Sequence, residues 1–230
     1  MIDATIEHCQ DKGDDGYMVT STLGRDPRAN YHHGNLEQAF ITAATAMIRE
    51  SGVEHISLRA VAAEVGVSPS AAYHYFPDKD ALLSGVGRTL FDLLADKQEI
   101  AISAFTGTSA EDARARFRAL GRSYFDWGKN EANFFRLMFG VFCSLAPDGR
   151  ELERSESRAW ILLERSLNEL EQTGAMNPAL RSYGEILAWS VVHGATSLIV
   201  EGHLPEEAFE AVLDGLELSL GITHGVVKKQ

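Results

Sequence analysis

The stretch from Ser57 to Lys79, SLRAVAAEVGVSPSAAYHYFPDK, constrains the fold of this chain more than any other. It predicts two short helices joined by a tight turn. Ser57 and Ser68 are suited to cap these helices, because a serine oxygen can accept a hydrogen bond from a free N–H of the first turn. Gly66 falls where a helix commonly ends in the left-handed conformation, and Pro69 falls in a first turn, where its missing N–H has no cost.

The second of these helices begins with small and polar side chains, SPSAA, and then carries Tyr73, His74 and Tyr75. Small residues let a backbone approach a surface closely, and the three rings can reach sideways with hydrogen-bonding groups. In a helix-turn-helix unit, the second helix enters the DNA major groove by its N-terminal end. The stretch therefore predicts a DNA-binding unit.

Apolar residues recur at helical spacing through the rest of the chain, and no segment has the alternation of a strand. The first helix is expected to begin at Asn35, with Gln38 three residues later as in a capping box. The expected fold class is all-α, with a three-helix helix-turn-helix head on a six-helix C-terminal bundle. The expected helices cover about 35–51, 57–65, 68–76, 78 to past 100, 110–128, a short aromatic-rich segment from Phe134 to Phe142, 150–173, 177–202 and 205–220.

Composition along the chain suggests four segments. These are a flexible N-terminal arm (1–30), a helix-turn-helix DNA-binding domain (31–77), a ligand-sensing and dimerisation domain (78–222) and a C-terminal tail (223–230). Met18 lies inside the arm, so residues 1–17 are either functional or an upstream extension. Four basic residues precede the first helix, either as solvated surface or as contacts to phosphate or the minor groove. They are Arg25, Arg28, His32 and His33.

The chain of 230 residues carries a formal charge of −12, which argues against binding of nucleic acid by bulk charge alone. The charge is uneven, because residues 25–90 hold six Lys and Arg against seven acidic residues, whereas the flanking parts are more acidic. Binding to DNA would therefore need individually placed contacts, and the acidic remainder would help to orient the molecule.

The two cysteines, Cys9 and Cys143, form no disulfide framework and suit a reducing cytosol. The N-terminus lacks the apolar core of a signal peptide. The longest uncharged apolar run, Ile186 to Val200, is too short to span a bilayer. These features favour a cytoplasmic protein with no membrane partner.

Several motifs together resemble the head of the TetR family of bacterial transcriptional regulators. The resemblance covers about residues 31–90 and includes the opening YHHGNL from Tyr31. A shorter match, Trp189 with His193 and Gly194, resembles the WHG-type C-terminal domain of the same family. The motif positions in the head are Gly52, Ser57-Leu58-Arg59, Val61-Ala62, Gly66-Val67-Ser68, Tyr73-His74-Tyr75-Phe76 and Asp78-Lys79.

The resemblance implies a bacterial homodimer that binds a palindromic operator, usually as a repressor released by a small-molecule effector. Arg59 and Ser70 are implied base-edge contacts, and Ser57, Tyr73, Tyr75 and Lys79 are implied phosphate contacts. Ser68 and His74 complete the candidate DNA-binding set. Many members of the family carry Thr where this chain has Ala71, so a hydroxyl contact from that position is excluded.

The body shows two further patterns. Apolar residues exceed one helical stripe between Ile186 and Val200 and again between Phe209 and Leu220, which predicts a homodimer interface. Aromatic residues on three successive segments exceed what a narrow bundle core packs easily, which predicts an effector pocket; plain core packing is the alternative, for His193 as well. The candidate pocket residues are Phe117, Tyr124, Trp127, Phe135, Met138, Phe139, Trp160, Trp189 and His193.

The sequence contains no phosphate-binding loop, nucleophile elbow or zinc-protease motif. The pairs His32-His33 and His8-Cys9 match no strong metal site. We therefore expect no enzyme activity, cofactor or metal. An all-α ligand-binding protein or enzyme that uses the helix-turn-helix only as structure remains the alternative. Exposure of Arg59, Ser70, Tyr73 and Lys79 would distinguish the two. The operator, the regulated genes, the effector and the sense of regulation stay open.

Overall fold

The computed structural model describes residues 33–139 and 157–222, and every regular element in these two ranges is a helix. The all-α prediction is thereby confirmed for this part of the chain. The elements are α1 (His33–Ser51), η2 (Val53–His55), α2 (Leu58–Val65), α3 (Pro69–Tyr75), α4 (Lys79–Ser103), α5 (Ala110–Asn130), α6 (Ala132–Met138), α7 (Arg158–Gln172), η5 (Pro178–Tyr183), α8 (Gly184–Val200) and α9 (Ala208–Ser219).

The boundaries of α2 and α3 follow from the residues that predicted them. The Ser57 hydroxyl accepts a hydrogen bond from the Ala60 N–H at 3.2 Å, and the Ser68 hydroxyl accepts one from the Ala71 N–H at 3.4 Å. Gly66 ends α2 with φ 79° and ψ 30°, a left-handed conformation that a residue with a Cβ adopts only with strain. The predicted helix-turn-helix is thus confirmed.

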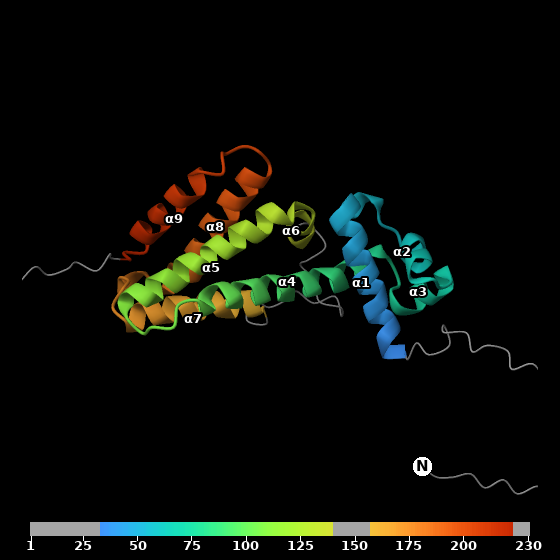
Figure 1. Ribbon diagram of the computed structural model, residues 1–230, viewed down its shortest axis with the longest axis horizontal. Coiled ribbons are helices and arrows are strands. Elements are labelled where there is room, and N and C mark those ends of the chain that lie inside the picture. Colours follow the sequence, from blue (N-terminus) through green and yellow to red (C-terminus); the bar gives the residue numbers. More distant parts are fainter. Residues whose placement is uncertain (1–32, 140–156, 223–230) are drawn as a thin grey trace, which may run out of the picture.

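α1, α2 and α3 enclose a small apolar core at one end of the molecule (Figure 1). The Phe40 ring lies in its centre, with centroids 6.0 Å from the rings of both Tyr75 and Phe76. This core fixes the orientation of α3 on α1. Val65 is half-buried at its edge, and the buried side chains are Phe40, Ala44, Ile48, Ile56, Leu58, Val61, Ala62, Ala72 and Phe76.

α4 connects this head to the body, where α5 and α7 pack against its far part. α8 packs against α5 and α9 against α8, on the side of α5 away from α4 (Figure 1). Asp78 caps α4 by accepting a hydrogen bond from the Ala81 N–H at 2.8 Å. Its apolar stripe of Leu82, Leu83, Val86, Leu90 and Leu94 is buried along its length. One continuous helix therefore contacts both the head and the body.

Some boundaries differ from those expected. α1 begins at His33, so Asn35 lies inside its first turn and the predicted capping box at Asn35 is wrong. Residues 178–183 form a 3-10 helix before α8, because Asn177 and Pro178 start a separate tight turn. Phe142, the predicted start of the seventh helix at 150, the arm and the tail lie outside the described residues.

Several large apolar side chains of α9 are buried in the single chain. Leu213, Leu216 and Phe209 of α9 face the interior, and Phe209 stacks on Phe125 of α5 with centroids 4.0 Å apart. These residues therefore do not belong to the outward face expected from the sequence.

None of the helices described is long and apolar enough to cross a membrane.

Candidate DNA-binding surface and aromatic site

The outer side of α3 is exposed while its inner side anchors it. Ser70, Tyr73 and His74 are exposed, with 49% of the Tyr73 surface accessible, whereas Ala72 is buried. Arg59 of α2 is exposed as well. A surface with one guanidinium, one serine hydroxyl and two polar rings presents the donors that phosphates and base edges accept.

Tyr75 and the two capping serines have structural roles in addition to their candidate roles in DNA binding. Tyr75 is half-buried against Phe40, and the His74 ring meets the Tyr75 ring edge-on at 5.4 Å. Ser57 and Ser68 use their oxygens to cap α2 and α3. Each hydroxyl keeps its proton for a second contact, because a serine can donate one hydrogen bond while accepting another.

Lys79 does not project freely. Its ammonium donates a hydrogen bond of 2.8 Å to the Val53 carbonyl, and the side chain is half-buried. No sequence pattern indicated this contact, which joins residues 26 apart. An ammonium carries three protons, so two remain for other acceptors.

The head also contacts the body directly through Arg49, at the end of α1. Its guanidinium forms an ion pair with Glu131 at 3.1 Å and lies 4.8 Å from the centroid of the Phe134 ring of α6. Asn133 donates a hydrogen bond of 3.2 Å to the Arg49 carbonyl. We call Arg49, Glu131, Asn133 and Phe134 the α1–α6 clasp; sequence reasoning missed it.

Six of the nine candidate pocket residues form one cluster of rings in the body. His193 of α8 lies at its centre, with its ring centroid 4.5 Å from Phe139, 5.3 Å from Phe135 and 5.7 Å from Trp189. The cluster is linked to α4 by an edge-on contact of 5.7 Å between Phe91 and Phe139. We call it the aromatic cluster: Tyr124, Phe135, Phe139, Trp160, Trp189 and His193.

The remaining candidates, Phe117, Trp127 and Met138, are buried in the continuous core. An open groove lies on another side of the body, between α5 and α9. It encloses about 520 Å³ and is lined by Phe105, Ala115, Arg118, Ala119, Arg122, Glu210 and Leu213. The sequence prediction looked only for aromatic density, so this groove, lined by arginines and a glutamate beside apolar side chains, was missed.

Two polar groups meet inside the aromatic cluster. The Tyr124 hydroxyl and His193 Nδ1 are 2.9 Å apart. Burial raises the pKa of Tyr124, while a hydrogen bond from Trp189 acts in the opposite sense. Burial lowers the pKa of His193, because the protonated ring would lose its hydration. Both side chains are therefore neutral at pH 7.

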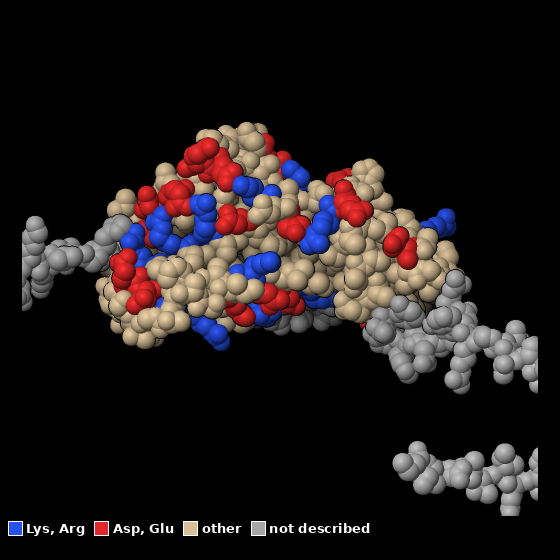
Figure 2. All heavy atoms as spheres, viewed as in Figure 1, with Lys and Arg blue, Asp and Glu red and all other residues tan. Residues whose placement is uncertain are grey.

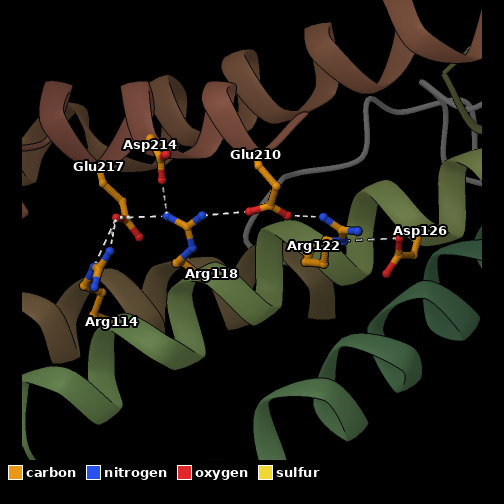
Figure 3. Close-up of polar contacts among 7 residues, drawn as sticks. All are labelled: Arg114, Arg118, Arg122, Asp126, Glu210, Asp214 and Glu217. Carbon is orange, nitrogen blue, oxygen red and sulfur yellow. Dashed lines mark hydrogen bonds and ion pairs between the residues drawn. The ribbon is translucent and has the colours of Figure 1, made fainter. Parts of the chain in front are cut away.

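A ladder of ion pairs holds α9 against α5 (Figure 3). Glu217, with 3% of its side chain exposed, accepts hydrogen bonds from Arg114 and lies 3.1 Å from an Arg118 nitrogen. Arg118 also pairs with Asp214 and Glu210, and Arg122 pairs with Glu210. The three arginines recur at four-residue spacing, the one sequence signal that pointed to a shared helix face.

On the face of the molecule shown in Figure 2, charged side chains of both signs are interleaved over the body. The visible side of the head carries few charges of either sign. The ladder explains part of this pattern, because acids of α9 are neutralised locally by arginines of α5.

An all-helical head of three helices, joined by one long helix to a helical body, is a fold found among bacterial transcriptional regulators. A family described as bacterial regulatory proteins, tetR family, matches residues 40–86. A second, described as tetracyclin repressor-like, C-terminal domain, matches residues 117–216, which include Trp189, His193 and Gly194.

Curated relatives match the N-terminal part. The HTH-type transcriptional regulator BetI of Yersinia pestis (strain Pestoides F) is 35% identical over 89 residues, which are 39% of this chain and 43% of the relative. BetI of Rhizobium meliloti (strain 1021) is 34% identical over 88 residues, or 38% of this chain and 41% of the relative. The chain thus spans about two fifths of the length of these curated relatives.

Solved structures match most of the chain. A protein of unknown function from Rhodococcus sp. RHA1 has 27% identity and a TM-score of 0.66, covering 84% of this chain and 99% of that one. A TetR family transcription regulator from Marinobacter aquaeolei VT8 has 21% identity and a TM-score of 0.55, covering 81% and 96%. FadR from Bacillus subtilis, solved with stearoyl-CoA, has 16% identity and a TM-score of 0.59, covering 81% and 99%. The chain belongs to the TetR family.

Proposed function

We propose that this protein is a sequence-specific DNA-binding transcriptional regulator of the bacterial cytoplasm, a repressor released from a palindromic operator by a small-molecule effector. One observation carries the proposal: the outer side of α3 presents Ser70, Tyr73 and His74 to solvent while Ala72 is buried. A helix-turn-helix used only as structure would bury these groups, so the exposed face favours the regulator over the alternative.

The proposed contacts follow the geometry of α2 and α3. Ser70 stands at the N-terminal end of α3, which is the part that enters a major groove, and Arg59 flanks it from α2. These two residues read base edges. Phosphate contacts come from the rims, through the hydroxyls of Ser57 and Ser68, the rings of Tyr73, His74 and Tyr75, and the Lys79 ammonium.

The proposed homodimer uses α8 and α9. Large apolar side chains remain exposed there, including Ile186, Leu198 and Leu218, the last with 75% of its surface accessible. A Cβ added at Gly194 or Gly215 would meet no atom within 4 Å, so both helices leave room for a close neighbour. A two-fold dimer would cover this face in both copies at once.

Release by an effector needs a connection from the body to the head, and two are available. α4 runs from the head into the body, and the α1–α6 clasp joins the other side. A dimer must hold its recognition helices about 34–36 Å apart to enter successive major grooves. A ligand that favours another tilt of the heads lowers DNA affinity by its differential affinity for the two states.

The proposal is tested by incubating the purified full-length chain with sheared genomic DNA of its source and sequencing the bound fragments. We expect a few strongly enriched sites that share an inverted repeat. The matched control is Tyr73→Ala, which alters the exposed face of α3 and leaves the head core intact. Enrichment of no site, or the same enrichment by the variant, would favour the alternative in which the helix-turn-helix is only structural.

A further inference from the structure

The aromatic cluster contains a directional hydrogen-bond relay. An indole N–H can only donate, so the bond between Trp189 and Tyr124 runs from Trp189 to the Tyr124 oxygen. The Tyr124 hydroxyl then has its own proton to donate, and His193 Nδ1 lies 2.9 Å away. Donation to Nδ1 satisfies this buried hydroxyl proton, which would otherwise lack an acceptor among the described residues, so the favoured direction runs from Trp189 through Tyr124 to His193.

This relay fixes the tautomer of His193. A neutral imidazole carries its proton on one nitrogen and accepts with the other. Because Nδ1 accepts the Tyr124 proton, the ring proton lies on Nε2. Burial lowers the pKa of His193, and no carboxylate in the described part of the chain acts to raise it, so the ring stays neutral near pH 7.

The Nε2–H of His193 has no hydrogen-bond partner within residues 33–139 and 157–222. The His193 side chain is only half-buried, and so are Phe139, Trp160 and Trp189 around it. The cluster therefore offers one N–H donor, framed by the faces and edges of aromatic rings that are accessible in part.

We propose that this N–H anchors a flat, neutral aromatic ligand through a carbonyl or similar acceptor oxygen. The inference rests on the proposed function, of which this ligand would be the effector. The rings supply stacking and edge contacts for an aromatic body, and Nε2–H supplies one directed bond. An anion would need more donors than the single one that the described residues of this cluster offer.

A cationic ligand is the main competitor, because aromatic rings also attract cations through their faces. The His193 ring at the centre of the cluster argues against a cationic ligand. A proton on Nε2 of His193 would repel a cation that comes close to this nitrogen. Protonation of His193 is opposed by burial, and among residues 33–139 and 157–222 no carboxylate contributes to the pKa of the ring.

Three probes of similar size separate these ligand classes in calorimetric titrations of the full-length chain. Acetophenone carries a carbonyl, α-methylstyrene has the same shape without the acceptor, and phenyltrimethylammonium is a cation. We expect acetophenone to bind at least tenfold more tightly than either of the others. Equal binding of acetophenone and α-methylstyrene, tighter binding of the cation, or no binding of acetophenone at millimolar concentration would overturn the proposal.

Variants test the donor itself. His193→Gln keeps an N–H donor near the position of Nε2, whereas His193→Leu removes it. We expect the tenfold preference for acetophenone to survive in His193→Gln and to vanish in His193→Leu. A preference unchanged in His193→Leu would show that another group binds the carbonyl. Circular dichroism checks that both variants fold.

Imidazole ¹⁵N NMR reads the tautomer without any ligand. We expect the His193 signal, assigned by its loss in His193→Gln, to show the proton on Nε2 at pH 8. In Tyr124→Phe the relay is broken and a mixture of tautomers should appear. A proton on Nδ1 in the unaltered chain would refute the proposal. Operator binding is measured separately, so failure of the probes leaves the DNA-binding function standing, and failure to bind DNA does not alter the probe result.

Discussion

The ammonium of Lys79 donates a hydrogen bond of 2.8 Å to the carbonyl of Val53, 26 residues earlier in the chain. This bond joins the first turn of α4 to the short helix η2 that follows α1. Lys79 therefore holds the base of the head on the helix that leads into the body. It also places a cation beside the rim of the proposed DNA-binding surface, so under our proposal this residue contributes both to stability and to DNA binding.

We expect Lys79→Ala to lower both the stability of the fold and the affinity for DNA. Loss of a hydrogen bond to a charged donor should reduce the free energy of unfolding by about 1.5–3 kcal/mol. Loss of one phosphate contact should reduce the slope of log affinity against log salt by about 1 for every duplex. Urea unfolding and DNA titrations at several salt concentrations measure the two effects, with Lys97→Ala on the exposed side of α4 as control. A loss of stability with an unchanged salt slope would make Lys79 purely structural.

Arg59→Ala should act differently, because Arg59 is proposed to read a base edge. We expect a loss of about 1–3 kcal/mol on the specific duplex and a relaxed preference at one base pair. Arg165→Ala, which removes an exposed arginine of α7, is the matched control and should leave DNA binding unchanged. Equal losses on specific and scrambled duplexes would identify Arg59 as a phosphate contact instead.

The ion-pair ladder predicts a strong contrast between two arginines of α5. Arg114→Ala leaves the buried Glu217 carboxylate with its main partner removed, and we expect a loss of about 3–5 kcal/mol in the free energy of unfolding. Arg122→Ala breaks pairs with partly exposed acids and should cost about 0–1 kcal/mol. Urea unfolding at constant salt compares them. Similar small losses in both would mean that Arg118 alone compensates Glu217.

Burial of His193 predicts a pH dependence of stability. The pKa of His193 in the folded chain lies below its ordinary value of 6.5, so between these two pKa values the unfolded chain binds more protons. Stability should therefore fall as the pH decreases through this window, by at most about 1.4 kcal/mol per pH unit for one group. The difference in unfolding free energy between the unaltered chain and His193→Gln, measured from pH 7.5 to 5, isolates this contribution. A difference that does not change with pH would contradict the buried, neutral ring.

The local signals in the sequence were reliable because the physics behind them is local. Ser57, Gly66 and Ser68 define α2 and α3 through contacts with residues at most four positions away. Asn35 shows the limit of such reasoning, since a good capping residue does not start a helix when the chain is already helical before it.

Contacts between residues that are far apart in the sequence could not be predicted from such local signals. Arg114 and Glu217 are 103 residues apart, and Arg49 and Glu131 are 82 apart, so no window of sequence pairs them. The aromatic residues were correctly placed in the body, but density alone could not tell His193 and Trp189, which meet in the cluster, from Trp127, which is buried apart from it. Only the packing of α5, α6 and α8 makes that distinction.

The exposed face of α8 and α9 predicts the assembly of the protein. Leu218 has 75% of its surface accessible in the single chain, so replacing it with a charged residue should not disturb the fold of that chain. In a dimer built on this face, Leu218→Glu would place two carboxylates near the two-fold axis and bury them without partners, which costs several kcal/mol. We expect sedimentation at micromolar concentration to show a species of twice the chain mass for the unaltered protein and the monomer for Leu218→Glu. Leu93→Glu, an equally apolar exposed position on α4, should remain dimeric. A dimer that survives Leu218→Glu would move the interface away from α9, and a monomer in the unaltered protein would remove the paired recognition helices on which a palindromic operator depends.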